Sequence, residues 1–538
     1  MGTACHQKII AFLLDATVPK RLDRFGSQPE AAERETTHCR MRREAVSSSL
    51  YNRHRQKSFL TRLMTIGGIM NLRGTLLQPW NYHTPRLDDD GKNLWQRLQR
   101  DAQAYADLRF TAVWLPPASK GTGGQQDVGY GIKDWHDLDG TKYGDGDQLA
   151  AACRALKALG IQVYHDQVHN HLMGGDVEQD VWCLHVEKNN KNKRLHEHSE
   201  WFQADIPTGY PWLGLNRHHF DAYHPNDHDC WALSDKRFDR EANVDPLMGC
   251  DLDFDSMDLV MKLRQFGLDF KRRIAVDGYR FDAVKHIRPK GTLNFLTDMR
   301  RSESRNLFAV GEYLSENLSE LKEYVAETYG QLSLFDFALQ RKFVRASREH
   351  SSFDMSSLSY GTFTAEMPVL SVSFVHSHDD QPPAHGKAHR GEYVGDWFIS
   401  QAYAFTLLRD QGYPMVSDVD LNSHAECIKR LALARAHCTY GWRHDRFDHL
   451  NTVGWSFSGG HGFDNSMAVV MTNGILGTKW LPTGKAGGRY RDLLDGHAHT
   501  VTTNDDGWAQ FSCPDRSTAV WVEASKYEQI KQLAESIA

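Results

Sequence analysis

The stretch Val276-Asp-Gly-Tyr-Arg-Phe-Asp-Ala-Val-Lys-His286 joins a short apolar segment to charged and polar residues. Val276–Phe281 has the length and the apolar content of a buried strand. Arg280 and Asp282 close this strand two positions apart, so their side chains fall on the same side of an extended backbone. In parallel barrels the carboxyl ends of the strands converge on one face, where functional sites lie. The stretch therefore predicts both a buried strand and a site at its end.

From about residue 70 the chain alternates between apolar strand candidates and helical stretches. The helical stretches, such as Leu94–Leu108 and Gln148–Leu159, carry apolar residues at i, i+3 and i+4 spacing. Eight strands separated by helices indicate a fold of the α/β class, a closed parallel (β/α)₈ or TIM barrel. The strand candidates are Gly74–Trp80, Phe110–Pro116, Ile161–Val168, Val276–Phe281, Leu307–Val310, Leu332–Phe337, Val369–Val375 and Tyr413–Val416.

The remaining segments predict units beside the barrel. Residues 172–250 are far too long for a single loop, so we expect an inserted small β-rich domain after the third strand. Short β-rich runs after the helical segment Glu426–His437 predict a C-terminal antiparallel β-sandwich domain. The expected division is 1–66, a disordered basic extension; 67–171 and 251–441, the barrel; 172–250, the inserted domain; 442–525, the C-terminal β domain; and 526–538, a C-terminal tail.

The composition narrows the class of protein. A net charge of −6 over 538 residues gives no reason to expect a nucleic-acid or anionic-membrane partner. Residues 1–63 carry 12 Lys/Arg against 6 Asp/Glu, and we interpret them as a flexible extension rather than a targeting peptide. Nine scattered cysteines suit reduced thiols, and neither a cleavable signal nor a run of about 18 apolar residues is found. We therefore expect a cytoplasmic protein with no membrane partner.

Polar residues come directly after several of the strand candidates. Asn170 and His171 follow the third strand, Glu312 follows the fifth, and His378 and Asp379 follow the seventh. Together with the acid at the end of the fourth strand, three carboxylates would point into one pocket. A single acid at such a position is as often a salt bridge or a helix cap, but three of them beside Arg or His indicate a catalytic site.

Four motifs occur in a fixed order along the chain and resemble the ordered signature regions of the α-amylase family of glycoside hydrolases. A fifth stretch, Asp245-Pro-Leu-Met-Gly-Cys-Asp251, resembles the segment that precedes the fourth strand in that family. The similarity covers roughly residues 70 to 525. The four motifs are Asp166-Gln-Val-His-Asn-His171, Gly278-Tyr-Arg-Phe-Asp-Ala-Val-Lys-His286, Val310-Gly-Glu-Tyr313 and Phe374-Val-His-Ser-His-Asp379.

This resemblance implies a retaining mechanism with three catalytic carboxylates. Asp282 would attack the anomeric carbon and form a covalent glycosyl-enzyme, and Glu312 would protonate the leaving oxygen and then deprotonate water. Asp379 would bind sugar hydroxyls and help to distort the ring. The reaction would be endo-hydrolysis of α-1,4 bonds in an α-glucan polysaccharide or oligosaccharide, and we expect the enzyme to act as a monomer.

The resemblance also implies a set of residues that contact the substrate. Arg280 would keep the neighbouring carboxylate ionised. The Lys285-His286 pair lies on the leaving-group side in the family and accompanies cleavage of α-1,4 links, which favours that linkage over α-1,6. The full set is Tyr130, His171, Arg280, Lys285, His286 and His378.

A structural calcium ion is the expected cofactor. Alternating acids would place three carboxylates on one side of an extended segment, which is repulsive unless a hard cation lies among them. By resemblance, the calcium would be held by the side chains of Asn170, Asp245 and Asp251 and by the backbone carbonyl of His286. The other two acids of the alternating segment, which would serve a second cation, are Asp253 and Asp255.

Three features depart from the family pattern around the substrate cleft. Ser377 stands where the family usually has Asn, Gln78-Pro-Trp-Asn-Tyr82 is unusual near the first strand, and Tyr413-Pro-Met-Val-Ser-Asp418 lacks the family's Phe-Tyr-Gly stretch. These departures leave open a transglycosylase, an α-glucosidase or an exo-acting maltooligosaccharide-forming enzyme. A non-catalytic glucan-binding protein is a further alternative, although such proteins would be expected to lose at least one of the three carboxylates.

Overall fold

The computed structural model describes residues 73–187, 190–195, 200–224, 229–233, 247–303, 306–382, 392–460, 462 and 464–537. Every described residue belongs to one compact unit, Leu63–Ala538. The expected extension at residues 1–66 lies outside the described residues, and its disorder stays a prediction.

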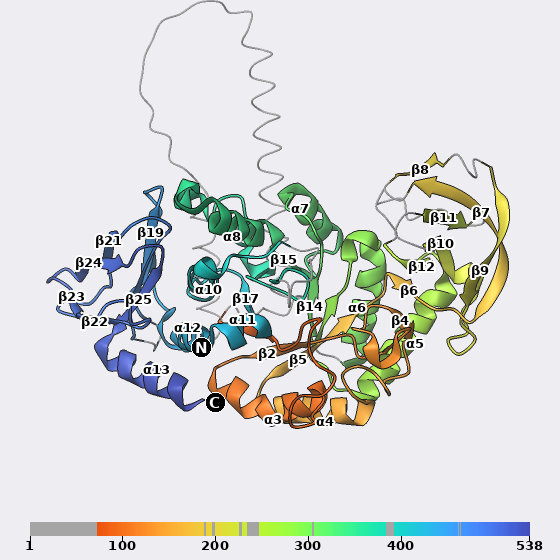
Figure 1. The fold of residues 1–538 in the computed structure, drawn as a ribbon, viewed down its shortest axis with the longest axis horizontal. Coiled ribbons are helices and arrows are strands. Elements are labelled where there is room, and N and C mark those ends of the chain that lie inside the picture. Colours follow the sequence, from red (N-terminus) through yellow and green to blue (C-terminus); the bar gives the residue numbers. More distant parts are fainter. Residues whose placement is uncertain are drawn as a thin grey trace, which may run out of the picture. The chain divides into compact units, whose positions relative to one another are not determined.

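Eight parallel strands close a barrel in the order β1-β17-β16-β15-β14-β13-β5-β2 (Figure 1). Each strand falls within or beside one of the predicted segments, so the predicted barrel is confirmed. The strands are short. They are buried because helices cover the outside of the barrel and side chains fill its inside. They are β1 (Leu76–Gln78), β2 (Ala112–Leu115), β5 (Gln162–Gln167), β13 (Gly278–Phe281), β14 (Phe308–Gly311), β15 (Ser333–Phe335), β16 (Ser371–Ser373) and β17 (Tyr413–Ser417).

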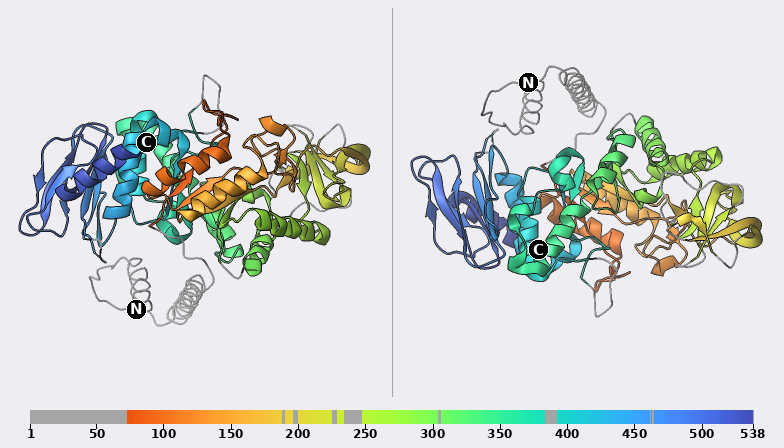
Figure 2. Two further views of the ribbon diagram at one scale, coloured as in Figure 1. Left: turned by 90° about the horizontal axis from the view of Figure 1, so that it is seen from below. Right: turned by 90° about the horizontal axis from the view of Figure 1, so that it is seen from above.

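Several helices between these strands begin at a side-chain cap, among them α3, α5, α7 and α8. In α3, Asn93 and Gln96 form a reciprocal capping box, and the helix buries Leu94, Trp95 and Leu98. Helices α3 and α4, orange in Figure 2, lie side by side, as do α5 and α6. The helices of this part of the chain are α3 (Leu94–Asp107), α4 (Gly146–Ala158), α5 (Met257–Arg273), α6 (Pro289–Glu303), α7 (Leu318–Glu327), α8 (Phe337–Glu349), α9 (Phe363–Glu366), α10 (Ile399–Leu407), α11 (Asp418–Ser423) and α12 (Ala425–Cys438).

The connection between β5 and β13 contains a β-sheet of its own, as the sequence predicts. Its strands run in the order β6-β12-β10-β11-β7-β8, and β9 also pairs with β7 (Figure 1). The first and last strands along the chain, β6 and β12, are paired, so the insertion leaves and rejoins the barrel at one place. The strands are β6 (His171–Leu172), β7 (Val177–Glu187), β8 (Asn190–Arg194), β9 (Phe202–Gly209), β10 (Phe220–His224), β11 (Asp229–Leu233) and β12 (Gly249–Leu252).

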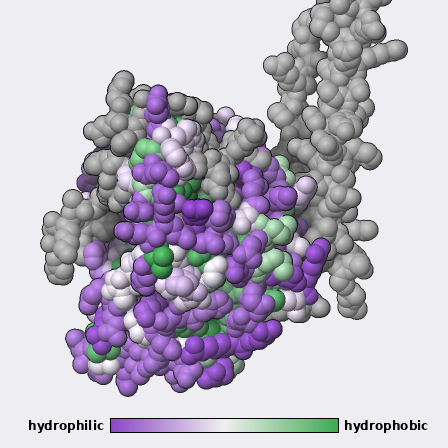
Figure 3. Space-filling model, turned by 90° about the vertical axis from the view of Figure 1, so that its right-hand side faces the viewer, coloured by the Kyte–Doolittle hydropathy of each residue, from purple (hydrophilic) through white to green (hydrophobic). Residues whose placement is uncertain are grey.

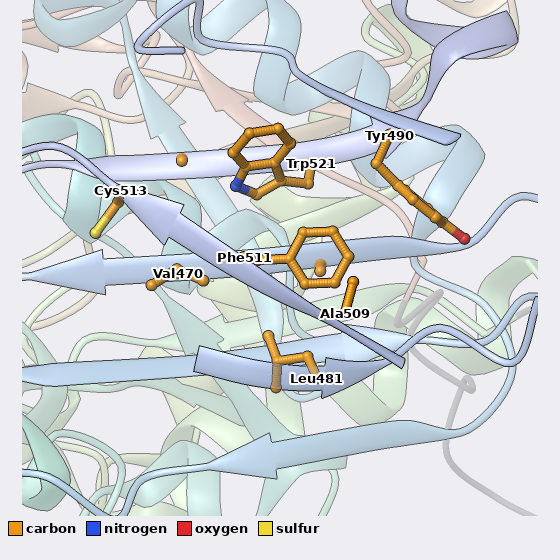
Figure 4. Packing of buried hydrophobic residues seen from close by; sticks show 9 residues of the cluster. Val470, Leu481, Tyr490, Ala509, Phe511, Cys513 and Trp521 are labelled. Carbon is orange, nitrogen blue, oxygen red and sulfur yellow. The ribbon is translucent and has the colours of Figure 1, made fainter. Parts of the chain in front are cut away.

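The C-terminal region is built from antiparallel sheets, in agreement with the predicted β-sandwich. Figure 4 shows Val470, Trp521 and Tyr490 of the larger sheet pointing toward Leu481 and Phe511 of a two-stranded sheet, which encloses an apolar core. The larger sheet has the order β18-β19-β20-β25-β22-β23, and the smaller pairs β21 with β24. The strands are β18 (Arg443–Arg446), β19 (Thr452–Phe457), β20 (Met467–Thr472), β21 (Gly477–Pro482), β22 (Arg489–Asp492), β23 (Val501–Thr502), β24 (Trp508–Cys513) and β25 (Thr518–Glu523).

The residues expected as a C-terminal tail form helix α13 (Ala524–Ser536), which contacts α12 and β22. The helix buries Tyr527, Ile530 and Ala534 at helical spacing, so it adds to the fold rather than trailing from it. None of the helices in the described part of the chain combines the length and apolar character that a bilayer span requires. The face shown in Figure 3 is mostly hydrophilic, with apolar residues scattered across it.

Candidate active site

The centre of the site is one buried guanidinium that contacts three carboxylates. Arg280 on β13 is 2% exposed. Its Nη1 donates to Asp166 Oδ1 at 2.8 Å and to Asp282 Oδ1 at 2.7 Å, and its Nη2 donates to Glu312 Oε2 at 2.9 Å. A guanidinium is planar, permanently charged and carries five N–H donors, so it can hold several acids in fixed relation. The acids predicted at the ends of two strands therefore meet on a common cation.

Barrel register explains why these side chains meet. β5, β13 and β14 are consecutive around the barrel, and Arg280 lies opposite Asp166 of β5. The N–H of Asp282 continues the ladder to a β5 carbonyl at 3.1 Å, and the N–H of Glu312 continues it to a β13 carbonyl at 2.9 Å. Both acids thus sit one residue beyond their strands, at the carboxyl end of the barrel, which is where active sites of this fold lie.

The residue after Asp282 has a strained backbone conformation that directs its N–H group toward Glu312. Ala283 has φ 47° and ψ 39°, in the left-handed region that non-glycine residues rarely occupy. In this conformation its N–H donates to Glu312 Oε2 at 3.0 Å, while the N–H of Val284 donates to the backbone carbonyl of Glu312 at 3.0 Å. Such strain gathers at functional sites because the surrounding structure holds it in place.

Burial and neighbouring charges set the protonation of the acids. Burial raises the pKa of Glu312, Arg280 opposes this shift, and the charges of Asp282 and Asp379 add to it. Burial also raises the pKa of Asp166, again opposed by Arg280 and reinforced by Asp282. Three acids beside one cation cannot all ionise as easily as in water. The cluster therefore favours a protonated carboxyl beside an ionised one, as acid–base chemistry requires.

A chain of hydrogen bonds links the seventh strand to the third. Gln78 Nε2 donates to His378 Nδ1 at 2.9 Å, so the ring proton of neutral His378 is on Nε2. His378 Nε2 lies 2.8 Å from the hydroxyl of Tyr130, and that hydroxyl donates to Asp166 Oδ2 at 2.8 Å. The rings of Tyr130 and His378 are parallel within 5°, with centroids 5.3 Å apart. Both predicted substrate contacts are therefore held in fixed orientation beside the acids.

Asp379 is held by groups on two sides. Tyr82 donates its hydroxyl proton to Asp379 Oδ1 at 2.7 Å, and His378 Nε2 lies 3.2 Å from Oδ2. The hydroxyl of Ser377 accepts the N–H groups of Asp379 at 3.2 Å and of Asp380 at 3.3 Å. Ser377, which departs from the family pattern, thus closes the turn that presents Asp379.

These groups line a small hollow at the carboxyl end of the barrel. Its wall combines aromatic rings with the charged cluster, a pairing that suits a sugar ring with apolar C–H faces and polar hydroxyls. The lining residues are Trp114, Arg280, Glu312, Phe335, Phe337, Phe374, Ser377, His378 and Asp379.

The remaining predicted contacts lie around the same strand ends. His171 Nε2 is 2.9 Å from the backbone carbonyl of Tyr130, and burial lowers the pKa of His171. Lys285 Nζ donates to the carbonyl of Leu314, two residues after the acid of β14, at 3.3 Å. His286 follows Lys285 in the 3-10 helix η4 (Val284–His286), directly after the turn of β13.

Two of the predicted calcium ligands are buried at the pairing of β6 with β12. Asn170 and Asp251 are 1% and 5% exposed, and β6 pairs His171 with Asp251. Asp245, the third side chain of the predicted set, lies outside the described residues. Within the described residues, no three His, Cys, Asp or Glu side chains gather in a metal-binding arrangement. Amide, carboxylate and carbonyl oxygens are nevertheless the donors that calcium prefers, so the residues present fit this ion.

The alternating acids after β12 do not share one side of an extended segment, and this expectation is wrong. β12 ends at Leu252, and the next residues form a turn into α5. Asp253 Oδ1 accepts the N–H of Asp255 at 2.9 Å, which closes that turn. Asp255 Oδ1 is 2.7 Å from Arg288 Nη1. Local hydrogen bonding by Asp in a turn competes with continued strand, and the sequence pattern did not reveal it.

Sequence reasoning missed several residues of the cluster. Asp166 is the first residue of the motif Asp166–His171, and the sequence predicted no role for it. Its side chain is fully buried against Arg280. Trp114 Nε1 also donates to Asp166 Oδ2, at 3.1 Å. Tyr82 and Gln78 lie at the end of the first strand. All four residues lie in or just beyond a barrel strand near its carboxyl end. This position in the sequence is the feature that could have predicted them as members of the site.

A pair of carboxylates at the strand ends of a closed (β/α)₈ barrel is an arrangement that enzymes cleaving glycosidic bonds can use. Residues 103–382 match the family described as Alpha amylase, catalytic domain. The chain belongs to the α-amylase family and is a glycoside hydrolase.

Individual relatives agree with this assignment. The chain is 35% identical over 485 residues to an alpha-amylase of Geobacillus stearothermophilus, covering 84% of this chain and 87% of the relative. It is 31% identical over 495 residues to the cytoplasmic alpha-amylase of Escherichia coli (strain K12), covering 83% and 98%. The crystal structure of alpha-amylase I from Eisenia fetida matches with a TM-score of 0.62 at 16% identity, covering 85% of this chain and 98% of that one, and shares the fold.

Proposed function

We propose that the chain is an α-amylase that cuts α-1,4-glucosidic bonds inside starch, glycogen or maltooligosaccharides by a retaining double displacement. The observation that carries this proposal is the arginine shared by Asp282 and Glu312, whose contacting oxygens lie 2.7 Å and 2.9 Å from two nitrogens of one guanidinium. The two acids are therefore neighbours. A retaining glycosidase needs its nucleophile and its acid/base about 5–5.5 Å apart, whereas an inverting enzyme leaves a wider gap for water.

In this mechanism the two acids take different roles because their surroundings differ. Asp282 contacts the charged Arg280, which fixes the carboxylate that attacks the anomeric carbon. Glu312 has a raised pKa, so it begins as the acid that protonates the leaving oxygen. Oε2 of Glu312 already accepts two hydrogen bonds, which leaves Oε1 to carry the transferred proton. After the leaving group departs, the same carboxylate takes a proton from the incoming water.

The other residues of the site would bind the sugar. Asp379, as a third carboxylate, would accept hydroxyl hydrogen bonds that strengthen as the ring flattens. His378 and Tyr130, fixed in the same network, would present an N–H and an aromatic face. His171 would add a contact on the same side, and the Lys285-His286 pair would lie toward the leaving group.

We also propose a structural calcium ion held by Asn170, Asp245, Asp251 and the carbonyl of His286. The burial of both Asn170 and Asp251, at neighbouring positions of the β6–β12 pairing, supports this proposal, since a buried amide and a buried carboxylate offer calcium the oxygen donors that it prefers. Bound at that position, calcium would tie the insertion to the barrel. The fully buried thiols Cys183 and Cys438, together with a relative named as cytoplasmic, support a location inside the cell.

The test is incubation with soluble starch and with a maltooligosaccharide blocked at its non-reducing end, following reducing ends and product lengths. Cleavage of the blocked substrate with a fast fall in starch chain length is expected. Release from starch alone would indicate exo action, and products longer than the substrate would indicate transfer. Asp282→Asn and Glu312→Gln should each abolish nearly all turnover while leaving the melting temperature close to wild type. Absence of turnover in the wild-type protein would favour the glucan-binding alternative.

A further inference from the structure

Tyr82 makes a contact to which the proposed function assigns no role. Its hydroxyl donates to Asp379 Oδ1 at 2.7 Å, and its ring meets the ring of His378 edge-on, with centroids 4.9 Å apart at 89°. Tyr82 comes from the loop after β1, whereas Asp379 and His378 come from the loop after β16. The contact therefore joins two strand ends that are separated in the barrel by β17.

The loop that carries Tyr82 is fixed by hydrogen bonds around it. Lys142 Nζ donates to the backbone carbonyl of Tyr82 at 2.8 Å. On the preceding residue, Asn81 Nδ2 donates to both carboxylate oxygens of Asp418, at 3.1 Å and 2.9 Å. The N–H of Thr84 closes the turn on the Asn81 carbonyl at 3.0 Å. With its backbone held from two sides, Tyr82 can present its hydroxyl at a constant position.

Among the acids of the site, Asp379 depends most on a hydrogen-bond donor to hold its carboxylate in place. Its side chain is 44% exposed, compared with 9% for Asp282, 19% for Glu312 and 0% for Asp166. The three less exposed acids contact Arg280, whereas the Asp379 carboxylate contacts Tyr82 and His378. A half-exposed carboxylate can turn toward water more readily than a buried one. A phenol donor on one oxygen and an imidazole on the other restrict that rotation.

We propose that Tyr82 is a positioning residue for Asp379, fixing the ionised carboxylate through Oδ1 so that its remaining acceptor positions meet the sugar hydroxyls. This inference rests on the proposed function, because it assigns Tyr82 to the same reaction. Burial and the nearby Asp379 raise the pKa of Tyr82 well above its usual range, so the phenol keeps its proton throughout the working pH range of the enzyme. A hydrogen bond to the charged form of a carboxyl group stabilises that form.

The variant Tyr82→Phe removes the hydroxyl and keeps the ring. We expect kcat/KM on a blocked aryl maltoheptaoside to fall about tenfold to a hundredfold, the range for a lost hydrogen bond to a charged group, with most of the loss in kcat. The acid limb of the pH profile should move to higher pH, because the ionised carboxylate of Asp379 has lost a donor.

Tyr143→Phe is the matched control. Tyr143 is a nearby buried tyrosine whose hydroxyl donates to the backbone carbonyl of Val128 at 3.0 Å rather than to an acid. Its loss should lower thermal stability slightly and leave the acid limb in place. The proposal is overturned if Tyr82→Phe keeps the wild-type rate, or if its rate falls with no change in the acid limb. A wild-type protein without turnover would instead refute the proposed function, so the two failures are distinguishable.

Discussion

Replacing Arg280 by methionine tests whether this guanidinium is the counter-charge of the whole carboxylate cluster. The side chain is 2% exposed and contacts Asp166, Asp282 and Glu312. Methionine fills much of the volume without the charge. Removing one partner of a buried ion pair costs about 3–5 kcal/mol, because the remaining charge is left uncompensated. Arg280 is the cation that all three acids contact, so a loss of about 3–5 kcal/mol is expected at neutral pH.

The fall in Tm that a given loss of stability causes depends on the number of residues that unfold together. Unfolding entropy of roughly 2.1 cal/mol/K per residue gives roughly 1 kcal/mol/K for Leu63–Ala538, so the Tm should fall by roughly 3–5 °C at about pH 7.5. Arg280 opposes the rise that burial causes in the pKa values of Asp166 and Glu312, so its loss should raise both further above their unfolded values. The folded state then binds more protons than the unfolded chain, and stability decreases as pH rises through that window. At about pH 4.5, near the unfolded pKa values, we expect the difference from wild type to shrink by roughly half or more.

Differential scanning calorimetry at the two pH values measures this difference, with Arg435→Met as the control. Arg435 is equally buried, but its guanidinium donates to the carbonyls of Gly74, Leu407 and Arg409. Carbonyls do not titrate, so the control should lose the same Tm at both pH values. An Arg280→Met deficit that is equal at both pH values, or larger in acid, would refute the idea that the arginine compensates ionised carboxylates.

Three further predictions concern neighbouring groups. Because the pKa of Glu312 is raised, the alkaline limb of wild-type kcat/KM should lie well above the ordinary glutamic acid value, and a decline beginning near pH 4–5 in the measured profile would contradict its role as the acid. Arg341→Met strands the buried Asp380 beside the site and should cost about 3 kcal/mol in denaturant unfolding, whereas the double variant with Asp380→Asn should recover most of it. Excess chelator should lower the Tm by roughly 3 °C if calcium was present at 100 times its Kd, and an unchanged melting curve would count against the ion.

The barrel could be predicted because each of its strands and helices has a recognisable pattern within a short stretch of sequence. Each strand is a short apolar run, each intervening helix has its own periodicity, and the order of strands in a parallel barrel is the order in the chain. The acids of the site were predictable for the same reason, since Asp282 and Glu312 stand directly after buried strands. A residue that comes next after a strand in the chain lies at the end of that strand in space, and a barrel gathers those ends.

Contacts between residues far apart in sequence were not predictable. The partner of Asp379 is Tyr82, 297 positions away, and the acid bound most fully by Arg280 is Asp166, 114 positions away. Periodicity indicates that such residues lie at strand ends but not which of them touch, because that depends on barrel register and on loop conformation. The prediction for the acidic run ending at Asp255 failed for a related reason. Alternation suggested extended backbone, while side-chain hydrogen bonds formed a turn.

Two of the departures from the family pattern form one structural change. The unusual residues after the first strand and those after the eighth are distant in sequence, but β1 pairs with β17, so barrel closure places them side by side. Asn81 from one stretch donates to both oxygens of Asp418 from the other. Burial raises the pKa of Asp418 to about 6, and the amide of Asn81 opposes that shift. Both residues are half-buried, and altering either one alone would remove the hydrogen bonds to the Asp418 carboxylate, which costs about 1.5–3 kcal/mol. The cleft wall here is therefore a coupled pair, and this pair supports the loop from which Tyr82 reaches Asp379.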